Sequence, residues 1–156
     1  MPALRIRLER LGFRAAHGAL RGWWFVRRPH VHGVKGVLRP VGGSSGEVLF
    51  IRHTYGDRAE WQLPGGGLGR REDPADAMRR EASEELGVEL HELRALGSVE
   101  GAGYHKTVTL HCFEALVDPA AVDVRWAEIE EVRWAPPTAA PQPLGESVAE
   151  MLALAT

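Results

Sequence analysis

The sequence predicts a single α/β domain in which a mixed β-sheet lies between helices. Three observations carry this prediction. β-rich runs alternate with two helical segments along most of the chain. A glycine-rich loop leads directly into a helix with clear start and stop signals. The 156 residues, 44% of them hydrophobic, suffice for one core and leave no room for a second full domain.

The first 28 residues differ from the rest of the chain in charge. They hold seven arginines against one acidic residue, Glu9, a balance of +6; with a net charge of −2, the remainder carries −8. Apolar residues at helical spacing, among them Leu4 and Leu8, indicate one or two amphipathic helical turns. We therefore divide the chain into a basic amphipathic arm (1–28) and a main domain (29–156).

Three interpretations of the arm stay open. It packs on its own domain or on the partner in a homodimer, it binds weakly to an anionic membrane surface, or it contacts nucleic acid. Packing is favoured, and the membrane surface comes next because Trp and Arg together suit an interface. No nucleic acid is expected, because no recognised nucleic-acid module accompanies the arginines.

The expected location is the cytoplasm. A single cysteine, Cys112, excludes an internal disulfide and suits a reducing compartment, where it is expected as a buried residue of a strand. The longest apolar run near the start is far shorter than the roughly 20 residues of a membrane-spanning helix.

After residue 29 the expected elements follow in order. Strands are expected at 31–38 and 47–53, joined by a glycine-rich segment that indicates a loose hairpin turn. A short strand is expected at 61–63, and longer strands are expected at 94–100, 107–117 and 128–134. A last helix is expected at 145–155.

The central helix is the best-signalled element. Asp73 and Pro74 are typical of an N-cap and first helical residue, and Gly87 stands at the usual stop, which predicts a helix over 74–86. Upstream, the loop 63–69 has four glycines in five positions, which permits close backbone approach. Glu72 and Arg80 lie within reach of each other, so that an ion pair would clamp this loop onto the helix.

Three acidic residues crowd one turn of this helix. Glu81, Glu84 and Glu85 stand at i, i+3 and i+4 and project from one face, where like charges repel. A divalent cation would remove the repulsion, since carboxylates are ligands that Mg²⁺ and Mn²⁺ prefer. A solvated acidic helix end is the other interpretation.

The whole pattern resembles the Nudix box, the signature of the Nudix hydrolase family. Every fixed position of the box is filled within residues 66–88: Gly66, Glu72, Arg80, Glu81, Glu84, Glu85 and Gly87. Ala82 stands where the family more often has Leu, Ile or Val. The resemblance implies an α/β/α sandwich with a loop-helix-loop catalytic motif. It also implies Mg²⁺, or Mn²⁺, and attack of water on a phosphorus of a nucleoside diphosphate linked to another moiety.

The resemblance also implies roles for residues of the box. Glu81 and Glu85 are the expected metal ligands with Glu84 as the third, and the carbonyl of Gly65 or of its neighbour Gly66 completes the shell. Glu72 and Arg80 form the structural brace of the catalytic motif. Glu81 is alternatively the general base, and acids outside the box remain unranked candidates for that role: Glu100, Glu114 and Asp118.

Substrate contacts are less strongly encoded, although a small nucleotide-type substrate is expected. Arg52, Lys35 and Lys106 are candidates for phosphate contacts. Tyr104 stands at an offset that resembles family members cleaving dinucleoside polyphosphates, and its ring could stack on a base. His53 and Tyr55 are further pocket candidates, with capping or packing the favoured role.

A function of another class stays open, because some proteins with this fold bind a nucleotide or sugar-nucleotide as sensors without hydrolysing it. Such sensors usually have a damaged box. The complete acidic set therefore favours the pyrophosphohydrolase.

Overall fold

A computed structural model describes residues 2–27, 30–43, 46–103 and 106–156. The longer elements, in chain order, are α1 (Pro2–Arg27), β1 (His30–Pro40), β2 (Val48–His53), α2 (Pro74–Leu86), β3 (His91–Gly103), β4 (Lys106–Val117), β5 (Ile129–Ala135) and α3 (Val148–Ala153). Short 3₁₀ turns at Pro119–Ala121 and Pro137–Ala139 flank β5.

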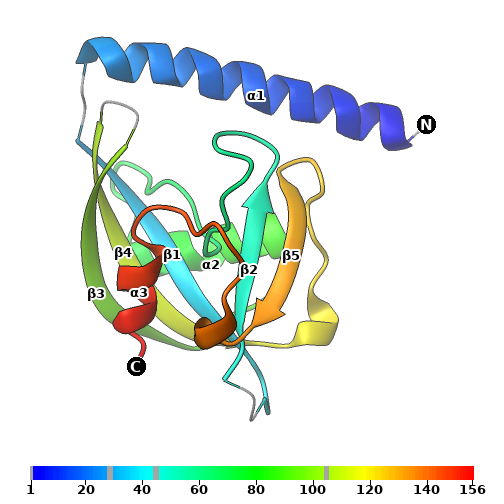
Figure 1. Cartoon of the computed structure of the whole chain (residues 1–156), viewed down its shortest axis with the longest axis vertical. Coiled ribbons are helices and arrows are strands. Elements are labelled where there is room, and N and C mark those ends of the chain that lie inside the picture. Colours follow the sequence, from blue (N-terminus) through cyan, green and yellow to red (C-terminus); the bar gives the residue numbers. More distant parts are fainter. Residues whose placement is uncertain (1, 28–29, 44–45, 104–105) are drawn as a thin grey trace.

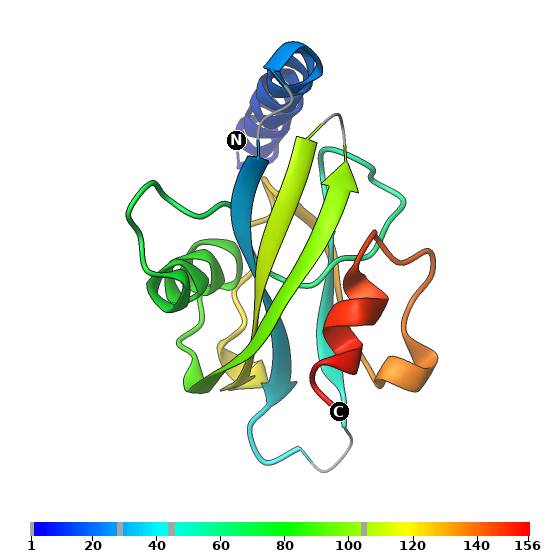
Figure 2. The same cartoon turned by 90° about the vertical axis from the view of Figure 1, so that its left-hand side faces the viewer.

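The strands form two small sheets that stand side by side. In the first, β4 lies between β1, to which it is parallel, and β3, to which it is antiparallel; in the second, β2 and β5 are antiparallel. Helices α2 and α3 cover opposite faces of these strands (Figure 1, Figure 2). The arrangement confirms the predicted α/β sandwich with mixed strand directions.

Two apolar cores occupy the two faces, because neighbouring residues of a strand point to opposite sides. In β2, Leu49 and Ile51 enter the core under α2, whereas Val48 and Phe50 enter the core under α3. All four are fully buried. Cys112 is buried in the α3-side core as expected.

The predicted hairpin between the first two strands is wrong. β1 pairs with β4 and β2 pairs with β5, while the segment 62–68 runs between β1 and β2 and bonds to both. Val34 N–H donates to Gly66 O at 2.9 Å, and Ile51 N–H donates to Gln62 O at 2.9 Å. The inserted segment satisfies backbone groups that a hairpin would otherwise pair.

Close approach explains why glycine is needed in this inserted segment. Gly65 has a φ of +131°, and a Cβ placed on it would lie 2.2 Å from the carbonyl oxygen of Val34. A side chain there would collide with the backbone of β1. The glycine-rich loop is thus wedged against β1.

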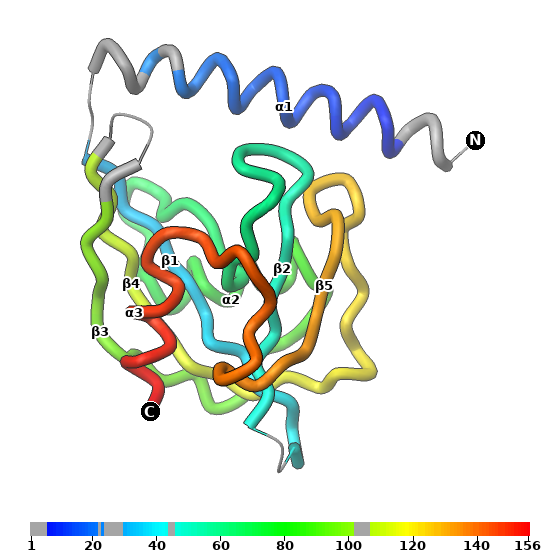
Figure 3. The backbone as a smooth tube through the Cα atoms, viewed as in Figure 1, coloured from blue at the N-terminus to red at the C-terminus, as the bar shows by residue number. Residues whose placement is uncertain are grey.

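Residues 2–27 form one continuous helix, α1, where only one or two helical turns were expected. The helix crosses the end of the domain at which β1 begins, with the N-terminus on the β5 side (Figure 1, Figure 3). Among the described residues, no helix combines the length and apolar character needed to span a membrane.

The remaining elements follow the prediction with shifted bounds. The strands expected at 94–100, 107–117 and 128–134 are β3, β4 and β5, and the last helix is shorter than expected. Trp61 and Gln62 form isolated bridges instead of a strand.

Candidate active site

Helix α2 begins and ends where its capping residues require. The Asp73 carboxylate accepts the backbone N–H groups of Ala75 and Asp76, Pro74 opens the helix, and Gly87 closes it in the left-handed conformation. Met78, Ala82 and Leu86 are fully buried. The helix is therefore fixed against the sheet, with its acidic face toward the glycine-rich loop.

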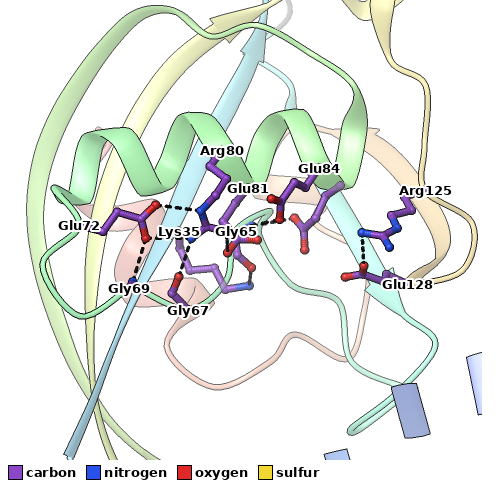
Figure 4. Close-up of polar contacts among 11 residues, drawn as sticks. Lys35, Gly65, Gly67, Gly69, Glu72, Arg80, Glu81, Glu84, Arg125 and Glu128 are labelled. Carbon is purple, nitrogen blue, oxygen red and sulfur yellow. Dashed lines mark hydrogen bonds and ion pairs between the residues drawn. The ribbon is translucent and has the colours of Figure 1, made fainter. Parts of the chain in front are cut away.

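Arg80 ties that loop to the helix, as predicted. Its guanidinium makes a two-bond contact with Glu72, with Nε to Oε1 at 2.8 Å and Nη2 to Oε2 at 3.0 Å. Its Nη2 also donates to Gly67 O, and its Nη1 donates to Glu81 at 2.8 Å (Figure 4). Hydrogen bonding to Arg80 holds the pKa of Glu72 at about 2.

We expect Arg80→Lys to lower kcat/KM by about 10-fold to 100-fold, because one ammonium cannot hold Glu72, Glu81 and Gly67 together and small misplacements are costly. Steady-state kinetics would measure the loss and circular dichroism would check the fold. Arg79→Lys is the matched control, since Arg79 is exposed and pairs with Asp76 on the same helix. Equal activity in wild type and Arg80→Lys would contradict the bracing role.

Glu85 is the most unusual side chain of the site, because it is a buried carboxylate. It is 3% exposed, and its Oε2 accepts the backbone N–H of Gly65 at 2.9 Å. Burial raises the pKa of Glu85 to about 8 against the opposing effects of Lys35 and the Gly65 N–H, and Glu81 adds to the rise. A carboxylate kept in such a place requires a compensating positive charge.

Glu81 lies against the same loop. A Cβ placed on Gly66 would lie 2.6 to 2.7 Å from the carboxyl atoms of Glu81, so only glycine leaves room for that carboxylate. Glu81 also binds Arg80, and its side chain is 13% exposed. Glu84, at 51% exposure, stands at the outer edge of the acidic face and reaches Arg80 at 3.4 Å.

Glu128 joins this group, although sequence reasoning missed it. It stands immediately before β5, and Arg125 Nη1 donates to its Oε1 at 2.8 Å. Burial raises the pKa of Glu128 against the effect of Arg125, and the nearby charges of Glu81 and Glu84 add to the rise. Figure 4 shows Glu128 past Glu84 along α2, on the side of the helix toward which the acidic side chains point. Its only signal in the sequence was an acidic residue at the start of an expected strand.

Lys35 supplies a positive charge beside these acids. Its Nζ donates to Leu63 O at 2.7 Å and to Gly65 O at 3.1 Å. Burial lowers the pKa of Lys35, and the charges of Glu85 and Glu81 oppose that effect. The Gly65 carbonyl, which was expected to face a metal, therefore accepts a hydrogen bond from this lysine.

The donor chemistry fits a hard divalent cation. Glu81, Glu85 and Glu128 are carboxylates whose charges act on one another, and oxygen ligands suit Mg²⁺ or Mn²⁺. Among the residues that the structure describes, no three such side chains are gathered closely enough to hold an ion as they stand. Arg80 binds Glu81, and the half-exposed Glu84 lies at the outer edge of the acidic face.

A cavity of about 640 Å³ opens beside the glycine loop. Its lining includes Lys35 and the backbone of 65–67, with His53 and Tyr55 on another wall. Apolar and aromatic walls next to a basic group suit a nucleotide, with the base on the rings and phosphate near the lysine.

Helix α1 contributes to this cavity, which the sequence did not reveal. His17 and Leu20 line it, and the His17 and Tyr55 rings lie 5.5 Å apart. The arm therefore packs on its own domain in this structure.

The other candidate residues lie elsewhere. Arg52 pairs with Glu131 at 2.8 Å, has its guanidinium over the Trp61 ring and is not among the residues that line the cavity. Tyr104 lies outside the described residues, and Lys106 is described only as the first residue of β4.

None of the three acids outside the box that were candidate bases joins the acidic group. Glu114 pairs with Arg39 and Arg94, which outweigh burial and hold its pKa below the usual range. Glu100 accepts the Thr109 hydroxyl, and Asp118 caps a 3₁₀ turn.

His53 makes the domain sensitive to acid. Burial lowers its pKa to about 3, so the folded state keeps it neutral while the unfolded chain protonates it below about 6.5. Its contribution to stability is therefore complete above pH 6.5 and is lost as the pH falls toward 3. Between these pH values the wild type should lose free energy of unfolding on the order of a few kcal/mol, and we expect His53→Phe to remove this loss. Urea unfolding of both proteins at several pH values would measure it; parallel pH profiles would contradict it.

Comparison with known proteins places these features in a family. The family model described as the NUDIX domain matches residues 32–155. RNA pyrophosphohydrolases of Pseudomonas syringae pv. syringae and Pseudomonas aeruginosa are 40% identical over 57 residues and 36% identical over 61 residues. These alignments span 36% and 39% of this chain but only 35% and 37% of the relatives, so the chain matches about a third of their length.

Solved structures show the same fold. The MutT NUDIX hydrolase from Burkholderia pseudomallei superposes with a TM-score of 0.73 at 23% identity, covering 81% of this chain and 98% of that one. The NUDIX domain of Shewanella oneidensis NrtR, crystallised with ADP ribose, superposes with a TM-score of 0.69 at 21% identity, covering 81% and 86%.

Proposed function

The chain belongs to the Nudix family, and on that premise we propose that it is a metal-dependent pyrophosphohydrolase. It cleaves a phosphoric anhydride bond in a nucleoside diphosphate linked to a second group. The observation that carries the proposal is the buried Glu85 carboxylate, held against the glycine loop beside Glu81.

The position of each side chain suggests its role. Glu85 and Glu81 would hold the cation, and Glu128, immediately before β5, would add a third carboxylate. The chemistry that bound Mg²⁺ or Mn²⁺ supplies is neutralisation of the diphosphate, a lower pKa of the attacking water and stabilisation of the leaving phosphate. Lys35, at the wall of the cavity, is placed to contact a phosphate oxygen.

The reaction is a hydrolysis that balances without a further reactant. The oxygen of water bonds to one phosphorus, the bridging P–O bond breaks, and the leaving phosphate keeps the bonding electrons. The proton of the water passes to a carboxylate, for which Glu81 and Glu128 are the candidates because both remain partly accessible.

The cavity supports a nucleotide-type substrate. Tyr55 and His53 present aromatic rings 5.0 Å apart on one wall, and Leu20 presents an apolar surface from α1. A base stacked there would leave its diphosphate directed to the glycine loop.

A panel assay tests the proposal. The protein is incubated with Mg²⁺ or Mn²⁺ and nucleoside triphosphates, nucleotide sugars, ADP-ribose, dinucleoside polyphosphates and CDP-alcohols, with product analysis by chromatography. We expect hydrolysis of at least one class, abolished by EDTA and restored by excess Mg²⁺. Hydrolysis that persists in EDTA would contradict the metal dependence.

The sensor remains the alternative function, and the same panel separates it. A sensor would bind a nucleotide in calorimetry and yield no product with either cation. The intact carboxylates at 81 and 85 favour the hydrolase, because they keep the oxygen donors that a catalytic divalent cation needs.

A further inference from the structure

The outward face of α1 is a feature that the candidate active site does not use. The inner face is anchored: Arg10 donates to Trp126 O at 2.8 and 2.9 Å, and Arg14 Nε donates to Thr54 O at 3.1 Å. The Phe13 ring stacks on Tyr55 at 6.0 Å. These contacts fix which side of the helix faces away from the domain.

The side opposite Phe13 is apolar. At 100° per residue, Leu8, Leu11, Ala15 and Ala19 fall within one arc of that outward side. Leu8 is 62% exposed and Leu11 is 63% exposed. Two leucines this exposed on one helix side form an apolar surface of the kind that marks an interaction site.

Two arginines border this apolar arc. Arg7 and Arg21 are exposed and stand fourteen residues apart, so that they differ by only about 40° around the helix. Arg14, between them, donates to Thr54 O of the domain. The one acidic residue of the arm, Glu9, lies off the arc. A helix with an apolar arc and a cationic border is suited to the boundary between lipid headgroups and acyl chains.

The net charge of residues 1–28 favours an anionic membrane over a second copy of the chain as the partner of this face. Residues 1–28 carry seven arginines and one glutamate, or +6, whereas the remainder carries −8. A second copy of the chain would bring two +6 segments together, which is unfavourable. An anionic membrane attracts the helix and repels the rest of the domain, which orients α1 toward the lipid.

We propose that the apolar face of α1, bordered by Arg7 and Arg21, binds an anionic phospholipid surface with the helix lying parallel to it. α1 crosses one end of the domain (Figure 1), so the bound molecule holds the cavity lined by His17 and Leu20 directly beneath the lipid-facing helix. This proposal does not rest on the proposed hydrolase activity.

Co-sedimentation of the full chain with vesicles tests it. We expect binding to equimolar phosphatidylcholine and phosphatidylglycerol vesicles at low salt, little binding to phosphatidylcholine alone, and strong weakening at high salt. The double variant Leu8→Gln with Leu11→Gln should lower the partition coefficient at least about tenfold. Arg7→Gln should lower it about fivefold.

The matched control removes two exposed apolar residues elsewhere. Val41 and Leu154 are 50% and 39% exposed, and Val41→Gln with Leu154→Gln should bind as wild type does. Circular dichroism checks that each variant is folded. Equal binding to both vesicle types, or binding unchanged by the leucine substitutions, would overturn the proposal. So would a dimer in analytical ultracentrifugation that these substitutions convert to a monomer without any vesicle binding, since the face would then serve self-association.

Discussion

Glu85→Gln should lower kcat by about 10³-fold or more while the protein remains folded, because Glu85 is the proposed metal ligand and such a ligand would contribute several kcal/mol to the transition state. The amide keeps the size of the side chain, and its oxygen can still accept the Gly65 N–H. What it removes is the negative charge at the centre of the acidic group. Single-turnover kinetics at saturating Mg²⁺ would measure the loss, and far-UV circular dichroism would check the fold.

The same substitution should lower activity but raise the stability of the metal-free protein, which separates the proposed role in catalysis from a role in folding. In the metal-free protein the pKa of Glu85 is raised from 4.5 to about 8 by burial. The folded state therefore holds this proton more tightly than the unfolded chain, and wild type loses stability as the pH rises through that window. Glu85→Gln in EDTA should be more stable than wild type at pH 8, with the gain shrinking toward pH 5. A variant that is both inactive and unfolded at pH 8 would contradict this account.

Gly66→Ala should cost about 100-fold in kcat/KM, because the new methyl group occupies the place of the Glu81 carboxylate and displaces it. The clash is with the end of a flexible side chain, so the fold should survive. Steady-state kinetics and thermal unfolding would measure the two effects.

The neighbouring glycine gives a matched comparison. A Cβ on Gly67 meets nothing within 4 Å, so Gly67→Ala should lose far less activity than Gly66→Ala. Gly65→Ala should instead destabilise the fold, because its clash is with the β1 backbone. Equal losses at 66 and 67 would show that Glu81 does not need its present position.

Local signals predicted the ends of α2 and its ion pair with the preceding loop. Asp73, Pro74 and Gly87 are residue types preferred at helix ends. In the structure they are the N-cap, the first residue and the C-cap of α2. The ion pair of Glu72 with Arg80 follows from their distance along the loop and helix. These features depend on residues close in sequence, which is why the sequence alone carries them.

The features that were missed depend on distant segments. The hairpin after β1 was wrong because an inserted loop, and not β2, bonds to the free edge of β1. Glu128 reaches the acidic group only because β5 pairs with β2. The length of α1 and its place at the cavity depend on contacts of Phe13 and Arg10 with loops far along the chain. Such contacts leave no periodic signal in a single sequence.

Attack of water on phosphorus at the Glu81 and Glu85 site would leave the oxygen of that water in a phosphate product. The most direct measurement is to hydrolyse the best substrate of the panel in ¹⁸O-labelled water with Mg²⁺ and to locate the label by mass spectrometry. We expect ¹⁸O in a phosphate group of one product and no labelled product from the Glu85→Gln protein. Label in the non-phosphate part of a product, or equal labelling by the Glu85→Gln protein, would contradict it.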